Sequence, residues 1–129
     1  MQALRIIPLG GLGEVGKNMT VRELGDDRIV IDAGLAFPRD EHLGVDLVLP
    51  DVSYLEGRRL RAIVLTHGHE DHVGGLPYVL REVDVDEVIG TRLTLALVKS
   101  KLDEHGLAAV TALTEAEPGG VRDLSLIHI

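Results

Sequence analysis

The ten residues from Thr66 to Gly75, THGHEDHVGG, constrain this chain more than any other segment. They contain three of its six histidines, with Asp71 among them. The apolar run Ala62–Leu65 comes directly before, and such a run is typical of a strand buried on both faces of a sheet flanked by helices. Imidazole nitrogens and carboxylate oxygens are donors that Zn²⁺ accepts readily. The fold is therefore expected to present a metal site at the end of a buried strand.

The spacing within this segment predicts where each side chain points. Residues two apart at a strand end point the same way, so His67 and His69 can converge on one ion. A helix is expected to begin next, where neighbours diverge, so Asp71 and His72 are predicted to serve a second ion, with Glu70 pointing away. Two ions about 3.5–4 Å apart form a hydrolytic centre. The alternatives, a polar loop with fortuitous histidines or an Asp71 that merely caps the helix, explain this density poorly.

Composition limits the class of protein. With 129 residues, the chain is one domain or part of one. It has no cysteine, so nitrogen and oxygen atoms must hold any zinc. The net charge of −8 is unusual for a nucleic-acid binder and by itself favours a small-molecule hydrolase. We find no secretory signal and no apolar run long enough for a membrane span, and we expect a soluble, cytoplasmic protein.

The order of the expected elements indicates an α/β fold with a mixed sheet, because strands come first and helices alternate with them later. A hairpin and a long helix after an N-cap at Thr91 are the clearest elements. The expected strands are 4–9, 19–24, 28–32, 62–65, 85–89 and 109–113. The expected helical segments are 52–55, one through 76–80 and one ending at Gly106, and residues 37–50 are expected to form a loop.

The glycine-rich stretch near the start resembles two nucleotide-binding motifs. Gly11–Gly16 fits the dinucleotide fingerprint, with Asp32 at about the distance of the ribose-binding acid. The same stretch nearly fits a P-loop, although Asn18 stands where Ser or Thr should be. Both motifs need a helix next, whereas Met19–Leu24 alternates like a strand. A tight structural loop is therefore the favoured interpretation.

Asp32 has two interpretations that the sequence leaves open. It follows the apolar strand end Ile29–Ile31 and precedes Ala33-Gly34, so it can be a turn-initiating aspartate. It can equally be a carboxylate that orients the metal-binding loop. His42, His105 and His128 are expected to be structural or solvated.

Thr66–Gly75 resembles the metal-binding motif of the metallo-β-lactamase superfamily, whose fold is an αββα sandwich. Other blocks narrow the resemblance to bacterial ribonuclease J, over most of the chain. These blocks are residues 10–19, 31–38, 43–51 and 90–99.

The resemblance implies a role for each candidate residue. It makes His67 and His69 ligands of one zinc, makes Asp71 and His72 ligands of the other, and makes Asp32 an aspartate that supports the site. Asp32 and Asp71 are thereby the expected catalytic residues. Family members hydrolyse RNA phosphodiesters from the 5′ end and internally, by two-zinc activation of water. RNA is thus the expected partner, and the complete protein is expected to be a homo-oligomer.

The family's further ligands and its RNA-clamping domain lie downstream of these residues. We therefore expect residues 5–118 to be the N-terminal part of a metallo-β-lactamase domain, an incomplete αββα sandwich. Residues 119–129 are expected to be non-native or disordered, in a truncated gene model that is itself inactive. The alternatives are a same-fold thioesterase or lactamase acting on small molecules, and a non-catalytic nucleotide-binding module.

Overall fold

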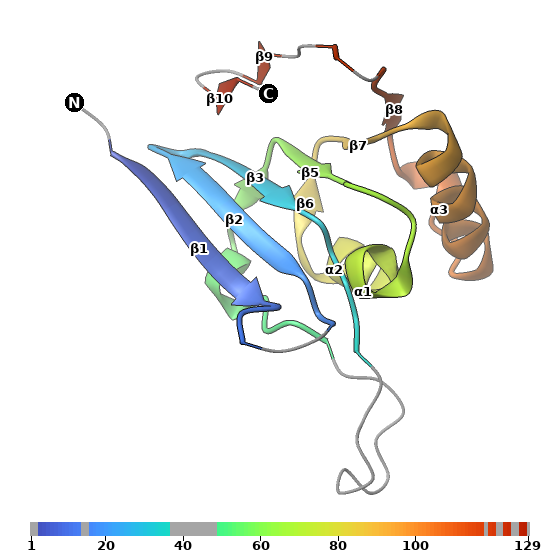
Figure 1. The fold of residues 1–129 in the computed structure, drawn as a ribbon, viewed down its shortest axis with the longest axis horizontal. Helices are drawn as coiled ribbons and strands as arrows, with labels where there is room; N and C mark the ends of the chain where they lie inside the picture. The colour runs from blue at the N-terminus through green and yellow to red at the C-terminus, as the bar shows by residue number, and fades with distance from the viewer. Residues whose placement is uncertain are drawn as a thin grey trace, which may run out of the picture.

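The computed structural model describes residues 3–13, 16–36, 49–117, 119–120, 123–124 and 127–128. Its centre is a six-stranded mixed sheet in the order β1-β2-β3-β5-β7-β8 (Figure 1). The strands are β1 (Leu4–Gly10), β2 (Met19–Leu24), β3 (Asp27–Ile31), β5 (Ala62–Val64), β7 (Val88–Gly90) and β8 (Leu113–Glu115). β1, β2 and β3 pair antiparallel, whereas β3, β5, β7 and β8 pair parallel. The expected α/β class with a mixed sheet is confirmed.

Helical segments, of which α3 is the longest, connect the parallel strands. They are η1 (Ser53–Leu55), α1 (Glu70–Val73), α2 (Leu76–Glu82), α3 (Arg92–Glu104) and η2 (Ala108–Val110). Two-residue strands form two small pairs, β4 (Arg59–Leu60) with β6 (Asp84–Val85) and β9 (Asp123–Leu124) with β10 (Ile127–His128). In Figure 1, α3 lies across the molecule from β1, as the strand order requires. Within the described residues, no helix has the length and apolar character needed to cross a membrane.

The buried strands contribute side chains to both faces of the sheet. Val30, Ile63 and Val88 belong to the main cluster, which the helices complete with residues such as Leu76 and Val98. Their neighbours alternate to the other face, where a second cluster is formed by Ile29, Ala62 and Ile89. Burial on both faces explains why residues 62–65 are continuously apolar.

Several predicted elements are confirmed. The hairpin is present, with β2 and β3 joined by a turn at Gly25 (φ +61°). Thr91 is the N-cap of α3, because its hydroxyl accepts from the Thr94 backbone N–H at 3.4 Å. Gly106 follows α3 with a φ of +71°, which an L side chain rarely adopts. The glycine-rich stretch leads into strand β2, so the helix that a phosphate-binding motif needs does not follow it.

Two predicted strands were wrong. The single strand expected at 85–89 is divided between β6, which pairs with β4, and β7, which pairs with β5. The division lies at Asp86, whose backbone N–H donates to the Leu60 carbonyl at 2.9 Å and whose carboxylate pairs with Arg59. The strand expected at 109–113 is η2 followed by β8, whose residues pair with β7. Apolar content marked these segments but did not fix their hydrogen-bonding partners.

Other predictions are not tested here. Most of the loop expected at 37–50, including His42, lies outside the described residues, as do several residues of the expected non-native tail. The domain limits of 5–118 and 119–129 therefore stay predictions. The cytoplasmic location also stays a prediction, because a fold does not determine where a protein is located.

One buried carboxylate ties η1 to the hairpin. Glu23 on β2 is 5% exposed, and its Oε2 accepts from Tyr54 Oη at 2.7 Å and from Arg28 Nε at 2.9 Å. Burial raises the pKa of Glu23, but the hydrogen bonds from Tyr54 and Arg28 and the positive charges of Arg28 and Arg58 outweigh it. The pKa of Glu23 is therefore held below its ordinary value of 4.5.

Candidate metal centre

The candidate centre lies at the carboxyl end of parallel strand β5. The strand ends at Val64, the loop passes through Thr66, and α1 begins at Glu70 with His69 as its N-cap (Figure 1). In open α/β sheets, ligands bind at the carboxyl ends of the parallel strands. The sheet therefore carries the histidine-rich loop to the edge where a site is expected.

Three of the predicted ligands form one group. His67, His69 and Asp71 each offer one ligand atom, and the three atoms all lie within 4.8 Å of one another. The rings of His67 and His69 are nearly perpendicular, with centroids 4.7 Å apart. Three nitrogen and oxygen ligands with an open fourth position are what a catalytic zinc has. The donor set therefore fits zinc, and Asp71 joins the two histidines instead of standing only with His72.

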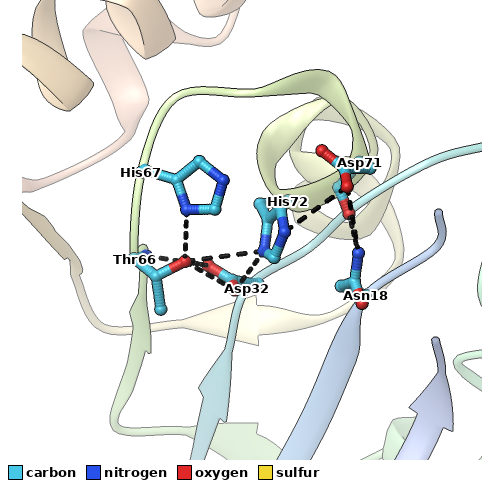
Figure 2. A network of polar contacts seen from close by, with 6 residues as sticks. All are labelled: Asn18, Asp32, Thr66, His67, Asp71 and His72. Carbon is cyan, nitrogen blue, oxygen red and sulfur yellow. Dashed lines mark hydrogen bonds and ion pairs between the residues drawn. The ribbon is translucent and has the colours of Figure 1, made fainter. Parts of the chain in front are cut away.

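His72 faces a different partner. Its Nδ1 lies 2.7 Å from Asp32 Oδ2, while its Nε2 lies 3.5 Å from Asp71 Oδ2 (Figure 2). Because an ionised carboxylate only accepts hydrogen bonds, Asp32 requires the proton of His72 on Nδ1. The Nε2 lone pair is then free, on the side of Asp71. This tautomer leaves Nε2 able to accept a metal ion, and the His72 ring centroid lies 4.0 Å from that of His67.

Asp32 accepts hydrogen bonds from Thr66 in the loop after β5 and from His72 on α1. It is 5% exposed, and its Oδ1 accepts from the Thr66 backbone N–H at 2.8 Å. Its Oδ2 accepts from the Thr66 hydroxyl at 2.8 Å as well as from His72. Its φ of +64° is a conformation that aspartate tolerates better than most residues. Of the two interpretations, the carboxylate that orients the loop accounts for these contacts, and a turn-initiating role alone does not.

Thr66 is a residue that the sequence reasoning missed. Its hydroxyl donates its one proton in the hydrogen bond to Asp32. The oxygen can therefore only accept a hydrogen bond from His67 Nδ1, at 3.0 Å. His67 then also carries its proton on Nδ1 and keeps Nε2 free for a metal ion. One buried carboxylate thereby sets the tautomers of two histidines, directly for His72 and through Thr66 for His67.

The start of α1 is held from outside the helix. Three consecutive carbonyls accept backbone hydrogen bonds from the glycine-rich turn and from the residues after β3. These bonds are Leu35 N–H to Glu70 O (3.1 Å), Asn18 N–H to Asp71 O (3.1 Å) and Ala33 N–H to His72 O (2.8 Å). Nothing in the spacing of these residues indicated that the three segments meet.

Glu70 lies outside the ligand group, in line with its expected orientation. Its carboxylate pairs with Lys101 on α3. A cavity of about 220 Å³ adjoins the centre at His72. Asp32, His72 and Asn18 line it, together with the turn between β1 and β2.

The family model of the metallo-beta-lactamase superfamily matches residues 12–124. The chain belongs to this superfamily. Ribonuclease J of Synechocystis sp. is 49% identical over 119 residues, which are 91% of this chain and 19% of that protein. Ribonuclease J2 of Bacillus subtilis is 51% identical over 114 residues, 87% of this chain and 20% of that protein. The chain thus spans about a fifth of the length of the curated relatives that it matches.

Solved structures agree on the fold. A protein of unknown function from Enterococcus faecalis V583 aligns with 99% of this chain and 36% of its own, at a TM-score of 0.70 and 15% identity. The Rm3 metallo-beta-lactamase aligns with 95% of this chain and 49% of its own, at a TM-score of 0.54 and 21% identity. These likenesses confirm that the chain has part of the metallo-beta-lactamase fold, as the resemblance implied.

Proposed function

We propose that this chain is the metal-bearing part of a ribonuclease J-type enzyme that hydrolyses RNA phosphodiesters with zinc. The observation that carries the proposal is the convergence of His67, His69 and Asp71 at the end of β5, in a sequence about half identical to named ribonucleases J. The proposal of RNA as the substrate rests on the names of those relatives. The proposal of a metal ion rests on the donor atoms of His67, His69 and Asp71.

Each residue has a role in this proposal. His67, His69 and Asp71 would hold one zinc ion, and His72 would serve a second ion together with ligands outside the described residues. When bound, zinc supplies Lewis acidity and makes water a nucleophile at neutral pH. Asp32 fixes the tautomer of His72 and, through Thr66, that of His67. The cavity between Asp32, His72 and the β1–β2 turn would admit the part of the substrate next to the reacting group.

The experiment uses the complete natural protein, stripped of metal and reloaded with zinc. We expect turnover of 5′-monophosphorylated RNA in the wild type and loss of nearly all of it in Asp71→Ala and in His69→Ala. Glu70→Gln is the matched control: it lies between these residues, and its side chain contacts Lys101 and not the ligand group. Wild-type rates in either ligand variant would contradict the assignment.

A same-fold hydrolase of small molecules is the second candidate, favoured by the net charge of −8. Thioester and β-lactam substrates given to the same zinc-loaded protein separate the two. Turnover of either one, without turnover of RNA, would replace the nuclease proposal while leaving the metal centre intact.

A further inference from the structure

The residue that joins the glycine-rich turn to the metal centre is Asn18. Its Nδ2 donates to the Asp71 carbonyl at 2.9 Å and lies 3.5 Å from Asp71 Oδ2 (Figure 2). Its backbone N–H donates to the same carbonyl at 3.1 Å. A carbonyl oxygen only accepts, so the nitrogen of the amide must face Asp71. One side chain thereby touches both the backbone and the carboxylate of a proposed ligand.

Asn18 is itself held tightly. Its carbonyl accepts from the Gly34 N–H at 3.0 Å, and Lys17 before it has a φ of +53°. A Cβ at Gly11 would lie 2.5 Å from Asn18 Oδ1 and strain the turn, and a Cβ at Gly34 would lie 1.8 Å from Asp71 O. The asparagine is therefore packed between two glycines that cannot carry side chains without a shift of their neighbours. Its amide has little freedom to leave Asp71.

Asp71 depends on support from outside its own helix. α1 has only four residues, and its N-cap His69 makes no side-chain capping bond. The Asp71 side chain is 41% exposed, so packing alone leaves it free to rotate. Among the described residues, side-chain contacts to its carboxylate come from Asn18 and from the ring of His72, another proposed ligand. Orientation of Asp71 before metal binding thus depends on Asn18.

We propose that Asn18 is a positioning residue that orients Asp71 for the metal ion. The inference rests on the proposed metal centre and adds a residue outside the histidine-rich segment to it. A group that orients a ligand lowers the cost of fixing that ligand when the ion binds, and removing such a group commonly reduces metal affinity about 10- to 100-fold. Asn18 also lines the adjoining cavity, so the same residue contacts the ligand and borders the space next to it.

The test measures zinc affinity of the full chain by competition with a chromophoric chelator, and the visible spectrum of the Co²⁺-loaded chain. We expect Asn18→Ala to weaken zinc binding about 10- to 100-fold and to change the Co²⁺ spectrum. Asn18→Asp keeps the shape of the side chain but turns an acceptor toward Asp71. Its zinc affinity should therefore fall at least as much as that of Asn18→Ala. It also serves as the second variant if the alanine chain folds poorly.

Val21→Ala is the matched control for general destabilisation. Val21 is fully buried on the same strand that follows Asn18 and belongs to the main cluster, so its truncation should lower stability and leave zinc affinity and the Co²⁺ spectrum unchanged. Asn18 variants with wild-type affinity and spectrum, or with only the changes seen in Val21→Ala, would overturn the role of Asn18. A wild type that binds zinc no better than His69→Ala would overturn the metal centre as well.

Discussion

The substitution Asp32→Asn tests whether a buried carboxylate sets the tautomers of the ligand histidines. Asparagine tolerates the positive φ of position 32 as aspartate does, so the backbone is unchanged. Its single oxygen can keep the bond to the Thr66 backbone N–H, and its NH₂ group then faces His72 Nδ1. A donor at this place requires an unprotonated Nδ1 and moves the proton of His72 to Nε2. The ring can then no longer offer Nε2 to a metal ion.

The size of the effect follows from the contacts that are lost. A hydrogen bond to a charged group contributes about 1.5–3 kcal/mol, and a neutral one about 0.5–1.5 kcal/mol. Asp32 is nearly buried whereas the His72 side chain is 22% exposed, so we expect the apo chain to lose about 1–2 kcal/mol of stability. Zinc affinity should fall about 10- to 100-fold, as when a partner behind a ligand is removed.

The assays are urea unfolding of the apo chain, a zinc competition titration, and nitrogen chemical shifts of the histidine rings, which report the tautomer. Asp32→Ala is the companion variant: it leaves the Thr66 N–H and His72 Nδ1 without a partner and should be less stable than Asp32→Asn. If Asp32→Asn kept the Nδ1–H tautomer of His72 and the zinc affinity of the wild type, Asp32 would be a turn residue and the reasoning would be refuted.

Three further predictions concern the fold around the site. Because the pKa of Glu23 lies below 4.5 in the folded chain, the stabilisation that its carboxylate contributes is complete above that pH and is lost as the pH falls through the folded pKa. Glu23→Gln should remove this part of the pH dependence of the unfolding free energy in urea melts. An unchanged pH profile in Glu23→Gln would contradict this role of Glu23. Gly34→Ala should lower the unfolding free energy by more than about 2 kcal/mol in urea melts, since its Cβ would lie 1.8 Å from the Asp71 carbonyl oxygen. A loss under about 0.5 kcal/mol would show that the backbone around Gly34 can shift at little cost. Thr91→Ala should lower the unfolding free energy by about 1 kcal/mol through loss of the cap of α3, whereas Thr91→Ser should retain most of it.

The sequence predicted the parts of the fold that depend on local pattern. A continuous apolar run fixed β5 as a doubly buried strand, and the alternation from Met19 to Leu24 ruled out a phosphate-binding helix after the glycine-rich turn. The N-cap at Thr91 and the stop at Gly106 depend on one side chain and one backbone angle, and both were predictable. The partners of short strands were not, because two- and three-residue strands such as β6 and β7 are defined by pairing with distant residues.

The same distinction applies to the metal centre. The histidine spacing predicted that His67 and His69 converge, because that geometry is local to a strand end. Asn18, Thr66 and the three carbonyls of α1 could not be found in this way, since their partners lie up to 53 residues apart in sequence. Asn18 stands out in the sequence only by its departure from the P-loop pattern and by its place in the family-like block 10–19, and neither signal indicates a contact with Asp71.

Asp71 and His72 show why adjacency in sequence is a weak guide to shared ligation. Their side chains leave the first turn of α1 in different directions: Asp71 joins His67 and His69, while His72 turns its Nδ1 toward Asp32. Yet His72 Nε2 remains 3.5 Å from Asp71 Oδ2, and the His72 ring centroid lies 4.0 Å from that of His67, so the third imidazole lies beside the other proposed ligands. The division expected from the sequence, His67 with His69 and Asp71 with His72, is therefore not a division into separate groups in space.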